Sequence, residues 1–394
     1  MVGSNVYEII ILGGGISGLL LASELSKRHC VAVFEKEPQI PQNKYWLTDK
    51  GSLDKNPHLK HLIDTTYEHM DFIAYDGTSY RCSGSYNLWD TKKLTEYLVN
   101  EILGNSGHVK TLCQFYGYTL KNNGIEVLAN DKTYRCKLAV DCMGYASPLI
   151  YSKGVIDLRG YYLVYGKTVK SKKQLDPVGF HNVTLNDKKP LYLEAFQRKN
   201  GDIHAVLIVP VRDLNDNYNL KEEFDFIAEK SSYSQYFDGE IGELSGVVPV
   251  GTVRRKALDR VLFYGEAGQI NPAATGTALT WLLYTYKDLA RVLSSKVKSN
   301  RLNLHNLDSL NVKYFSSYNR RLQMNFYRQL LKWNSFDYRN FVAELKNLDN
   351  SDIANNIIFA TFNRKNLLSK QMLGYLRRIK SPIIIGSMVK SFFW

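Results

Sequence analysis

Residues 7–18 read YEIIILGGGISG and place a glycine-rich loop directly after an apolar run. A continuous apolar run of this length is typical of a parallel strand that is buried on both faces. Gly13 allows a tight turn, Gly15 lets the backbone approach a pyrophosphate, and Gly18 lets the following helix pack on the strand. The segment therefore predicts a strand, a phosphate-binding loop and a helix, in that order.

The residues after this loop continue the pattern. Ile16 to Arg28 predicts a helix whose N-terminal N–H groups face the phosphates, and Val31 to Phe34 predicts a second strand. That strand ends at Glu35, where a carboxylate accepts hydrogen bonds from a ribose diol and repels a 2′-phosphate, which favours FAD or NAD over NADP. We expect the nucleotide to be bound by Gly13, Gly14, Gly15, Ile16, Ser17, Gly18, Glu35 and Lys36.

A second glycine-rich segment follows about 250 residues later, where residues 263–276 read FYGEAGQINPAATG. The first loop alone indicates a dinucleotide. Two such segments so far apart in the chain indicate a long cofactor that is held at both ends, and FAD fits this arrangement better than NAD.

Composition limits the class of protein. The 394 residues are enough for a substantial core and for two or three structural units. The five cysteines are odd in number and show no CxxC or Cys/His spacing, which predicts a reduced cytoplasmic setting and no structural metal. The apolar N-terminus lacks the basic start of a signal peptide, and no run approaches the roughly 20 apolar residues of a membrane-spanning helix.

The net charge of +13 is concentrated near the C-terminus, since residues 301–394 carry 15 Lys and Arg against 5 Asp and Glu. Basic and apolar residues alternate there, and the chain ends in Phe-Phe-Trp. This composition fits peripheral binding to an anionic membrane surface, with residues 381–394 as the contact. The alternative is a helical region with a solvated basic face. No recognition motif accompanies the charge, so nucleic acid is not an expected partner.

The pattern along the chain predicts an α/β fold with three parts. A discontinuous Rossmann-type FAD-binding domain takes residues 1–157 and 245–300, and contains a helix from Leu88 to Ile102 that begins at Asp90 or Thr91. Short strand patterns separated by turn residues predict an inserted antiparallel β-sheet substrate domain over 158–244. Residues 301–394 are expected to form a basic helical C-terminal appendix.

Several motifs in order resemble the lycopene cyclase branch of the FAD-binding superfamily that also contains aromatic hydroxylases and geranylgeranyl reductases. Besides the glycine loop, residues 139–149 (AVDCMGYASPL) are similar to the family's Asp-x-x-Gly…Ser-Pro strand end, and Tyr165-Gly166 to the strand that follows. Residues 248–251 (VPVG) and 265–276 are similar to the pattern Pro-x-Gly…Gly-x-Ala…His-Pro-x-Thr-Gly. The resemblance extends over about residues 5–300.

The resemblance implies roles for the second glycine segment. Glu266 stands where relatives carry an Asp that binds the ribitol, and Asn271-Pro272 stands where cyclases often have His-Pro. Residues 268–276 would open a helix whose N–H groups face the pyrimidine end of the flavin, where negative charge accumulates on reduction. The implied FAD contacts are Gly144, Gly265, Glu266, Gly268, Pro272, Thr275 and Gly276.

One departure from the family concerns the catalytic acid. Cyclases place two adjacent glutamates in a strand over the flavin, whereas the corresponding strand here, residues 203–210, has no carboxylate. The nearest acid is Glu194 on the preceding predicted strand. If the strand face that Glu194 shares with Tyr192 and Phe196 lines a cavity, the pKa of Glu194 is raised and its carboxyl suits general acid–base catalysis. If that face is in water, Glu194 is an ordinary strand residue. His204 and His181 are weaker catalytic candidates than Glu194, because a lone histidine on a strand edge is more often structural.

Three functions remain in competition. The first is an FAD-dependent oxidoreductase that acts on a hydrophobic, prenylated or polyene, small molecule, with electrons from transiently bound NAD(P)H or from a partner protein. The second is a non-redox cyclase or isomerase that uses reduced FAD. The third is a non-enzymatic flavin- and lipid-binding protein at a membrane. None of the five tryptophans lies in the Trp-x-Trp-x-Ile-Pro arrangement of flavin-dependent halogenases, which argues against halogenation.

Overall fold

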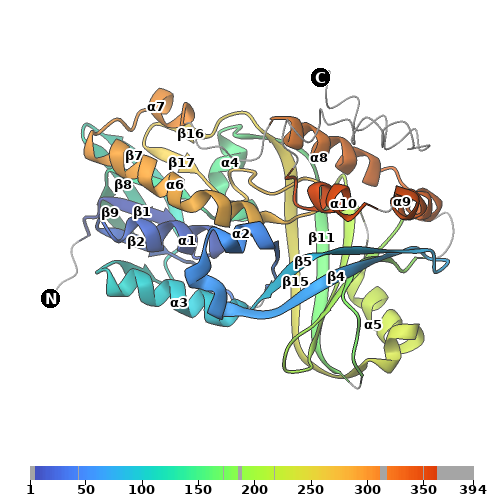
Figure 1. The fold of residues 1–394 in the computed structure, drawn as a ribbon. Helices are drawn as coiled ribbons and strands as arrows, with labels where there is room; N and C mark the ends of the chain where they lie inside the picture. Colours follow the sequence, from blue (N-terminus) through green and yellow to red (C-terminus); the bar gives the residue numbers. More distant parts are fainter. Residues whose placement is uncertain are drawn as a thin grey trace.

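A six-stranded sheet with the strand order β16–β17–β10–β1–β2–β6 forms the first layer of the protein (Figure 1). The computed structural model describes residues 5–42, 44–171, 173–184, 189–216, 218–310, 317–348 and 350–361. Neighbouring strands of this sheet run parallel except for the β16–β17 pair. The strands are β1 (Ile9–Leu12), β2 (Val31–Phe34), β6 (His108–Lys110), β10 (Leu138–Asp141), β16 (Ala257–Leu258) and β17 (Val261–Phe263).

Both faces of the parallel sheet are covered, which explains its uninterrupted apolar strands. On β1, Ile9 and Ile11 pack into a core formed with three helices, whereas Ile10 and Leu12 pack into a core formed with a small three-stranded sheet. The helices are α1 (Ile16–Leu25), α3 (Thr91–Gly104) and α6 (Ala278–Lys298), and the small sheet consists of β7 (Phe115–Lys121), β8 (Gly124–Ala129) and β9 (Lys132–Cys136).

A second, eight-stranded sheet has the order β15–β11–β14–β13–β12–β4–β5–β3 and is antiparallel except for the β12–β4 pair. The strands are β3 (Leu47–Asp49), β4 (Ile63–Ile73), β5 (Ser79–Trp89), β11 (Ile156–Ser171), β12 (Val178–Asn182), β13 (Tyr192–Gln197), β14 (Ile203–Val211) and β15 (Phe237–Val253). The expected antiparallel sheet is therefore present, but it extends beyond residues 158–244. Strands β3 to β5 come from the segment that the sequence assigned to the nucleotide domain. They join the large sheet because β4 pairs with the edge of β12.

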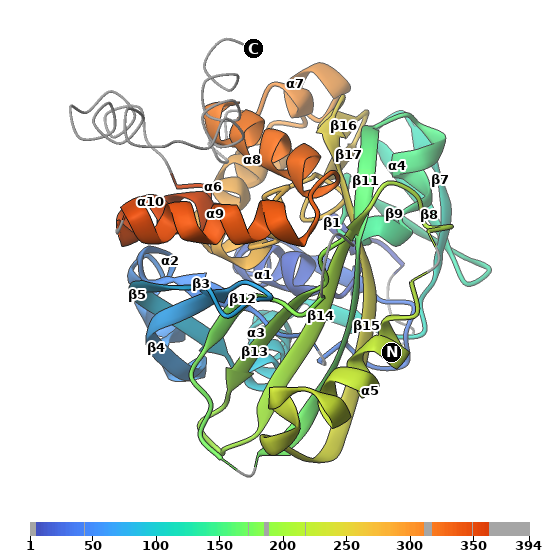
Figure 2. The same ribbon diagram turned by 90° about the vertical axis from the view of Figure 1, so that its right-hand side faces the viewer.

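The two faces of this large sheet have different cover (Figure 2). Leu193, Ala205 and Leu207 pack with helix α5 (Leu220–Lys230) on what we call the outer face. Side chains of the opposite parity, which form the inner face, pack against the C-terminal helices. These are α8 (Ser317–Leu330), α9 (Ser335–Leu348) and α10 (Ser351–Ile358).

The local elements agree with the sequence in part: the expected helix cap at Asp90 is present, but Leu88 and Trp89 before it belong to strand β5. Helix α3 begins after Asp90, whose carboxylate accepts a hydrogen bond from the backbone N–H of Lys93 at 3.1 Å. Strands β8 and β9 pair as a hairpin through Asn130 and Asp131, which both have positive φ. Helix α1 ends at Leu25 rather than Arg28.

Short elements complete the described chain: α2 (Lys50–Asp54), α4 (Pro148–Ser152), α7 (Leu304–Asp308) and the 3-10 turns η1 (Pro57–Leu62), η2 (Gly144–Ala146) and η3 (Ser232–Gln235). The expected membrane contact at residues 381–394 lies outside the described residues. Within the described ranges, no helix combines the length and apolar character that crossing a bilayer requires.

Candidate functional site

The phosphate-binding loop has the geometry that its glycines predict. Gly13 has φ +101, and a Cβ there would lie 2.7 Å from the carbonyl oxygen of Cys142. A Cβ at Gly18 would clash with the carbonyl oxygen of Gly13, so Gly18 is required for packing. A Cβ at Gly15 would meet nothing within 4 Å, and Gly15 precedes α1 without a side-chain cap. The helix start therefore faces open space with its N–H groups available to an anion, as a pyrophosphate requires.

Glu35 supports this loop from the end of β2. Its side chain is 7% exposed, and its Oε2 accepts a hydrogen bond from the N–H of Gly14 at 2.7 Å. Its Oε1 accepts from the N–H of Glu37 at 3.0 Å. The neighbouring Lys36 is exposed and pairs with Glu37 on the surface. Contacts of Glu35 and Lys36 with a ribose stay predictions.

The strand-end motif of β10 folds around a buried carboxylate. Asp141 is fully buried and accepts hydrogen bonds from the N–H of Met143, at 3.0 Å, and from the hydroxyl of Ser147. Burial raises the pKa of Asp141 to about 6. The hydrogen bonds of Asp141 hold a turn in which Gly144, with φ +64, lies against the carboxylate of Glu266. A Cβ at Gly144 would lie 2.7 Å from Oε2 of Glu266.

The two glycine-rich segments meet in space, as expected from the sequence. Gly265 has φ +67, and a Cβ there would clash with the hydroxyl of Ser17 at the start of α1. This proximity follows from the parallel sheet, because β1, β2, β10 and β17 all end at the same edge. Ligands of open α/β sheets bind at this carboxyl edge.

Gln269 ties the second glycine segment to the large sheet. Its Oε1 accepts from the N–H of Gly251 at 2.7 Å, and its Nε2 donates to the carbonyl of Glu266 at 3.0 Å. Tyr162 of β11 donates its hydroxyl to the carbonyl of Ala274 at 2.9 Å. The resemblance motifs at 248–251 and 265–276 are therefore in direct contact. Sequence reasoning missed the roles of Gln269 and Tyr162, although Gln269 lies within the quoted motif.

The end of this segment contains an unpaired buried acceptor. Asn271 is 9% exposed, and its Oδ1 has no hydrogen-bond partner in the described part of the chain. Helix α6 begins at Ala278, two residues after Gly276 and without a side-chain cap. A buried acceptor without a donor is costly, so this position suits the N–H of a bound group. With the open space at Gly15, these residues fit a cofactor that reaches from α1 to α6.

The C-terminal helices close the same segment from its other side. Thr275 and Thr277 both donate their hydroxyls to the carbonyl of Ile358, at 2.6 and 3.0 Å, and Trp281 donates to the carbonyl of Phe359 at 2.8 Å. Gln323 of α8 accepts from the N–H of Ala274 at 3.0 Å. The predicted cofactor residue Thr275 is thus a contact of α10, and its hydroxyl is already used in this contact.

Glu194 lies on the inner face of the large sheet, together with Tyr192 and Phe196. Tyr192 packs against α9, whereas the intervening Leu193 and Ala195 belong to the α5 core. The Glu194 carboxyl is only partly buried, has no hydrogen-bond partner in the described ranges, and is not fully enclosed by protein atoms. Burial nevertheless raises its pKa to about 8. A carboxyl with this pKa is protonated at pH 7. Glu194 is not among the residues that line the apolar cavity, so its catalytic role stays a prediction.

Glu194 is also close to the second glycine segment. The pKa of Tyr162 is raised mainly by burial, and the charge of nearby Glu194 contributes to the rise. Tyr162 also donates its hydroxyl to the carbonyl of Ala274, so it interacts with both Glu194 and the second glycine segment.

His204 is buried on the inner face of the large sheet, unlike an exposed histidine at a strand edge. It is 6% exposed, it stacks on Tyr45 with ring centroids 3.4 Å apart, and its Nδ1 is 3.0 Å from the hydroxyl of Thr168. The Tyr45 hydroxyl bonds the same Thr168 oxygen. Burial, helped by the Arg198 cation, lowers the pKa of His204 to about 2, so the ring is neutral.

His181, by contrast, bonds Tyr233 at 2.7 Å within the outer layer. Nothing in the sequence pairs Tyr45 or Thr168 with His204, because the three residues come from separate segments.

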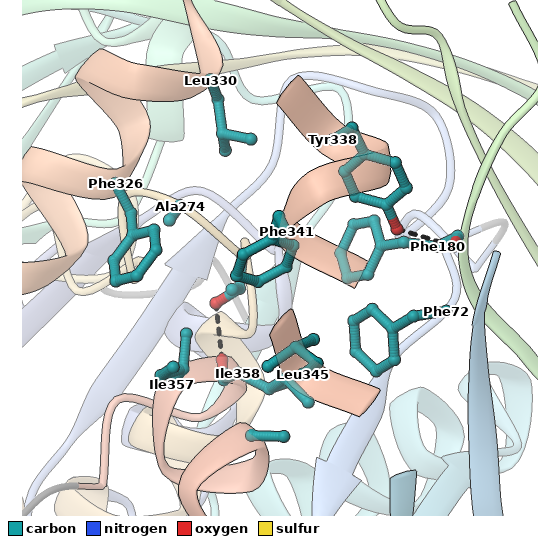
Figure 3. Close-up of a pocket in the computed structure, with 12 residues that line it drawn as sticks. Phe72, Phe180, Ala274, Phe326, Leu330, Tyr338, Phe341, Leu345, Ile357 and Ile358 are labelled. Carbon is teal, nitrogen blue, oxygen red and sulfur yellow. Dashed lines mark hydrogen bonds between the residues drawn. The ribbon is translucent and has the colours of Figure 1, made fainter. Parts of the chain in front are cut away.

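An apolar cavity of about 60 Å³ lies between the inner face and the C-terminal helices (Figure 3). Phe72 of β4 and Phe180 of β12 form one wall, and Ala274 and Thr275 of the glycine segment form another. The remaining wall comes from α8, α9 and α10, with Phe326, Phe341 and Ile357 among its residues. This volume holds about four water-sized molecules. Binding of a larger compound therefore requires the helices to move.

Comparison with known proteins supports the interpretation of these motifs. The model of the family described as lycopene cyclase protein matches residues 8–189. None of the curated proteins matches the sequence. Among solved structures, a geranylgeranyl bacteriochlorophyll reductase-like protein from Thermoplasma acidophilum is 15% identical, with a TM-score of 0.74 and coverage of 99% of this chain and 100% of that chain.

Two further structures are similar over nearly the whole chain. The p-nitrophenol 4-monooxygenase PnpA from Pseudomonas putida is 14% identical, with a TM-score of 0.64 over 95% of this chain and 98% of that chain. The halogenase PltM, solved in complex with FAD, is 12% identical, with a TM-score of 0.61 over 98% and 95%. At these identities the likeness concerns the fold. Together with the family match over residues 8–189, it confirms the resemblance of this chain to the lycopene cyclase branch of the FAD-binding flavoprotein superfamily.

Proposed function

We propose that this protein is an FAD-dependent oxidoreductase that acts on a hydrophobic small molecule bound between the inner face of the large sheet and helices α8 to α10. The observation that carries the proposal is the convergence of the two glycine-rich segments, with Gly265 against Ser17 and Glu266 against Gly144. The first contact joins the start of α1 to the segment that leads into α6, and the second joins the turn after β10 to the same segment. Bound FAD would supply a ring that accepts or donates a hydride.

The chain would hold the two ends of the cofactor with different groups. Backbone N–H groups at the start of α1 would bind the pyrophosphate, and Glu35 would turn toward the ribose. At the other end, Glu266 would accept from the ribitol and Asn271 would accept an N–H of the ring. The apolar cavity next to Ala274 and Thr275 would hold the hydrocarbon part of the substrate.

A non-redox cyclase or isomerase is the second candidate, and Glu194 is the observation that favours it. A carboxyl that is protonated near neutral pH and is not fully enclosed can deliver a proton to a carbon–carbon double bond. In the oxidoreductase, the same group would donate a hydrogen bond or a proton to the substrate while FAD exchanges the hydride.

The electron source is part of the proposal. The sequence contains no second nucleotide loop, so NADH or NADPH would bind transiently, or a partner protein would deliver electrons. Peripheral contact of the basic C-terminal region with an anionic membrane would give access to a hydrophobic substrate.

A spectroscopic experiment tests the proposal. The purified protein is mixed with FAD, freed of excess cofactor, and reduced anaerobically with NADH or NADPH. A retained flavin spectrum with rapid bleaching supports the oxidoreductase, and retained flavin that works only after chemical reduction, without net oxidation of a substrate, supports the cyclase or isomerase. Failure to retain FAD would overturn both.

A further inference from the structure

The inner face of the large sheet changes from polar to apolar along the strand direction. Cross-strand pairing places Phe196, His204 and Thr168 in one row, Glu194, Val206 and Gly166 in the next, and Tyr192, Ile208 and Val164 in a third. Successive rows are about 7 Å apart along the strands. His204, Thr168 and Glu194 therefore lie toward one end of the face. The aromatic cavity at Phe180 and α9 adjoins the other end, where the buried hydroxyl of Tyr192 has no hydrogen-bond partner among the described residues.

The polar end contains a hydrogen-bond relay that could run in either of two directions. Tyr45, Thr168 and His204 are linked through the two hydroxyls and the ring Nδ1. If Tyr45 donates to Thr168 and Thr168 donates to Nδ1, each of these groups is satisfied within the relay. In the reverse direction the Tyr45 hydroxyl would need a further acceptor, and its one hydrogen bond to a described residue is the one to Thr168. The favoured direction places the ring proton on Nε2.

The Nε2–H group of His204 donates no hydrogen bond within the described part of the protein. No described residue accepts a hydrogen bond from it, and the atom is not fully enclosed. The Glu194 carboxyl is in the same situation, one row away on the neighbouring strand and diagonal to His204 across the β13–β14 pair. Such diagonal neighbours are about 7–8 Å apart, so both groups can reach one small functional group or two adjacent ones.

We infer that His204, held by Thr168 and Tyr45, binds an oxygen atom of the substrate, and that the substrate is therefore an apolar molecule with a hydroxyl or carbonyl group rather than a pure hydrocarbon. The oxygen accepts the Nε2–H bond at the polar end, and the hydrocarbon part extends past Tyr192 toward the apolar cavity. This inference rests on the proposed function, because it assumes that the inner face binds the substrate.

A matched pair of ligands tests the inference. Geraniol and the hydrocarbon in which its hydroxyl is replaced by hydrogen are titrated into the FAD-loaded protein, with intrinsic tryptophan fluorescence as the signal. FAD retention is read independently from the visible absorption spectrum of the flavin, so failure to hold FAD, which counts against the proposed function, is observed separately from ligand preference. We expect geraniol to bind about tenfold more tightly than the hydrocarbon, which is the upper range for one neutral hydrogen bond.

Variants identify the group responsible. His204→Phe keeps a ring on Tyr45 and should abolish the preference while leaving hydrocarbon affinity within about twofold. His181→Phe is the matched control on the outer face and should keep the preference. Thr168→Val, which frees Nδ1 and the tautomer, should reduce the preference even if His204→Phe does not fold.

Two results would overturn the inference. One is equal affinity for both ligands, or no binding of either, by the wild-type protein. The other is a preference that survives in His204→Phe, including the case in which that variant also loses FAD. This last case would assign the hydrogen bond to the flavin.

Discussion

Replacement of Glu194 by Gln should change how stability depends on pH. The pKa of Glu194 is about 8 in the folded protein and 4.5 in its ordinary state, so between these values the folded protein binds more protons than the unfolded chain. The free energy of unfolding then falls as pH rises through this window. The Gln variant retains the shape of the side chain and lacks this titration.

The size of the effect follows from the shift. Each pH unit inside the window changes the free energy of unfolding by at most about 1.4 kcal/mol, which gives an upper limit of about 5 kcal/mol across the shift. Glu194 is only partly buried, so access of water to the carboxylate reduces the penalty. We expect the Gln variant to gain about 2–3 kcal/mol relative to wild type between about pH 5 and about pH 8.

Urea unfolding followed by tryptophan fluorescence at several pH values measures this difference. Tyr162 and Tyr192 have raised pKa values and do not titrate in this window. The lowered pKa of His204 makes the stability of both proteins rise with pH up to about 6.5, and this contribution cancels in the difference between them. Glu68→Gln is the control, since Glu68 is exposed on β4, and its curve should run parallel to wild type. If the Glu194→Gln curve also runs parallel to wild type, the carboxyl is not in a desolvated site and the acid–base role fails.

Two further changes separate packing from binding. Gly18→Ala should prevent normal folding because the new Cβ meets the carbonyl of Gly13. Gly15→Ala should keep the thermal midpoint of wild type but lower FAD affinity at least about tenfold, since its Cβ points into the open space where the phosphates are expected. Calorimetry measures the midpoints and FAD titration the affinities, and unchanged affinity of Gly15→Ala would exclude this loop as the phosphate site. Thr275→Val removes the hydrogen bond from the Thr275 hydroxyl to the carbonyl of Ile358 and should destabilise the docking of α10 by about 1 kcal/mol. The effect is measured as faster hydrogen exchange in residues 351–361. Unchanged exchange would show that the hydrogen bond from Thr277 is enough to hold the helix.

Local sequence determined the nucleotide-binding half of this protein. The loop at Gly13 to Gly18, the acid at the end of β2 and the helix after Asp90 were all predictable, because strand, turn and cap preferences act over a few residues. The approach of Gly265 to Ser17 was predictable as well, since parallel strands must end at one edge of their sheet.

The substrate side was predictable only as a list of candidates. Alternation along β13 put Glu194, Tyr192 and Phe196 on one face, but it could not decide whether that face met water or protein. The choice depends on α5 covering the outer face and the C-terminal helices covering the inner one. Helix α5 begins 26 positions after Glu194, and α8 begins 123 positions after it.

Sequence alone therefore specified the cofactor loops, whereas tertiary structure decided the character of the polar groups. The raised pKa of Glu194 and the neutral ring of His204 both come from burial, which depends on segments that are distant in the chain. Tyr45, Thr168 and His204 form a relay because three separate segments meet on one side of a sheet. Backbone preferences are local, but desolvation is a property of the whole packed surroundings, and only the folded chain supplies those surroundings.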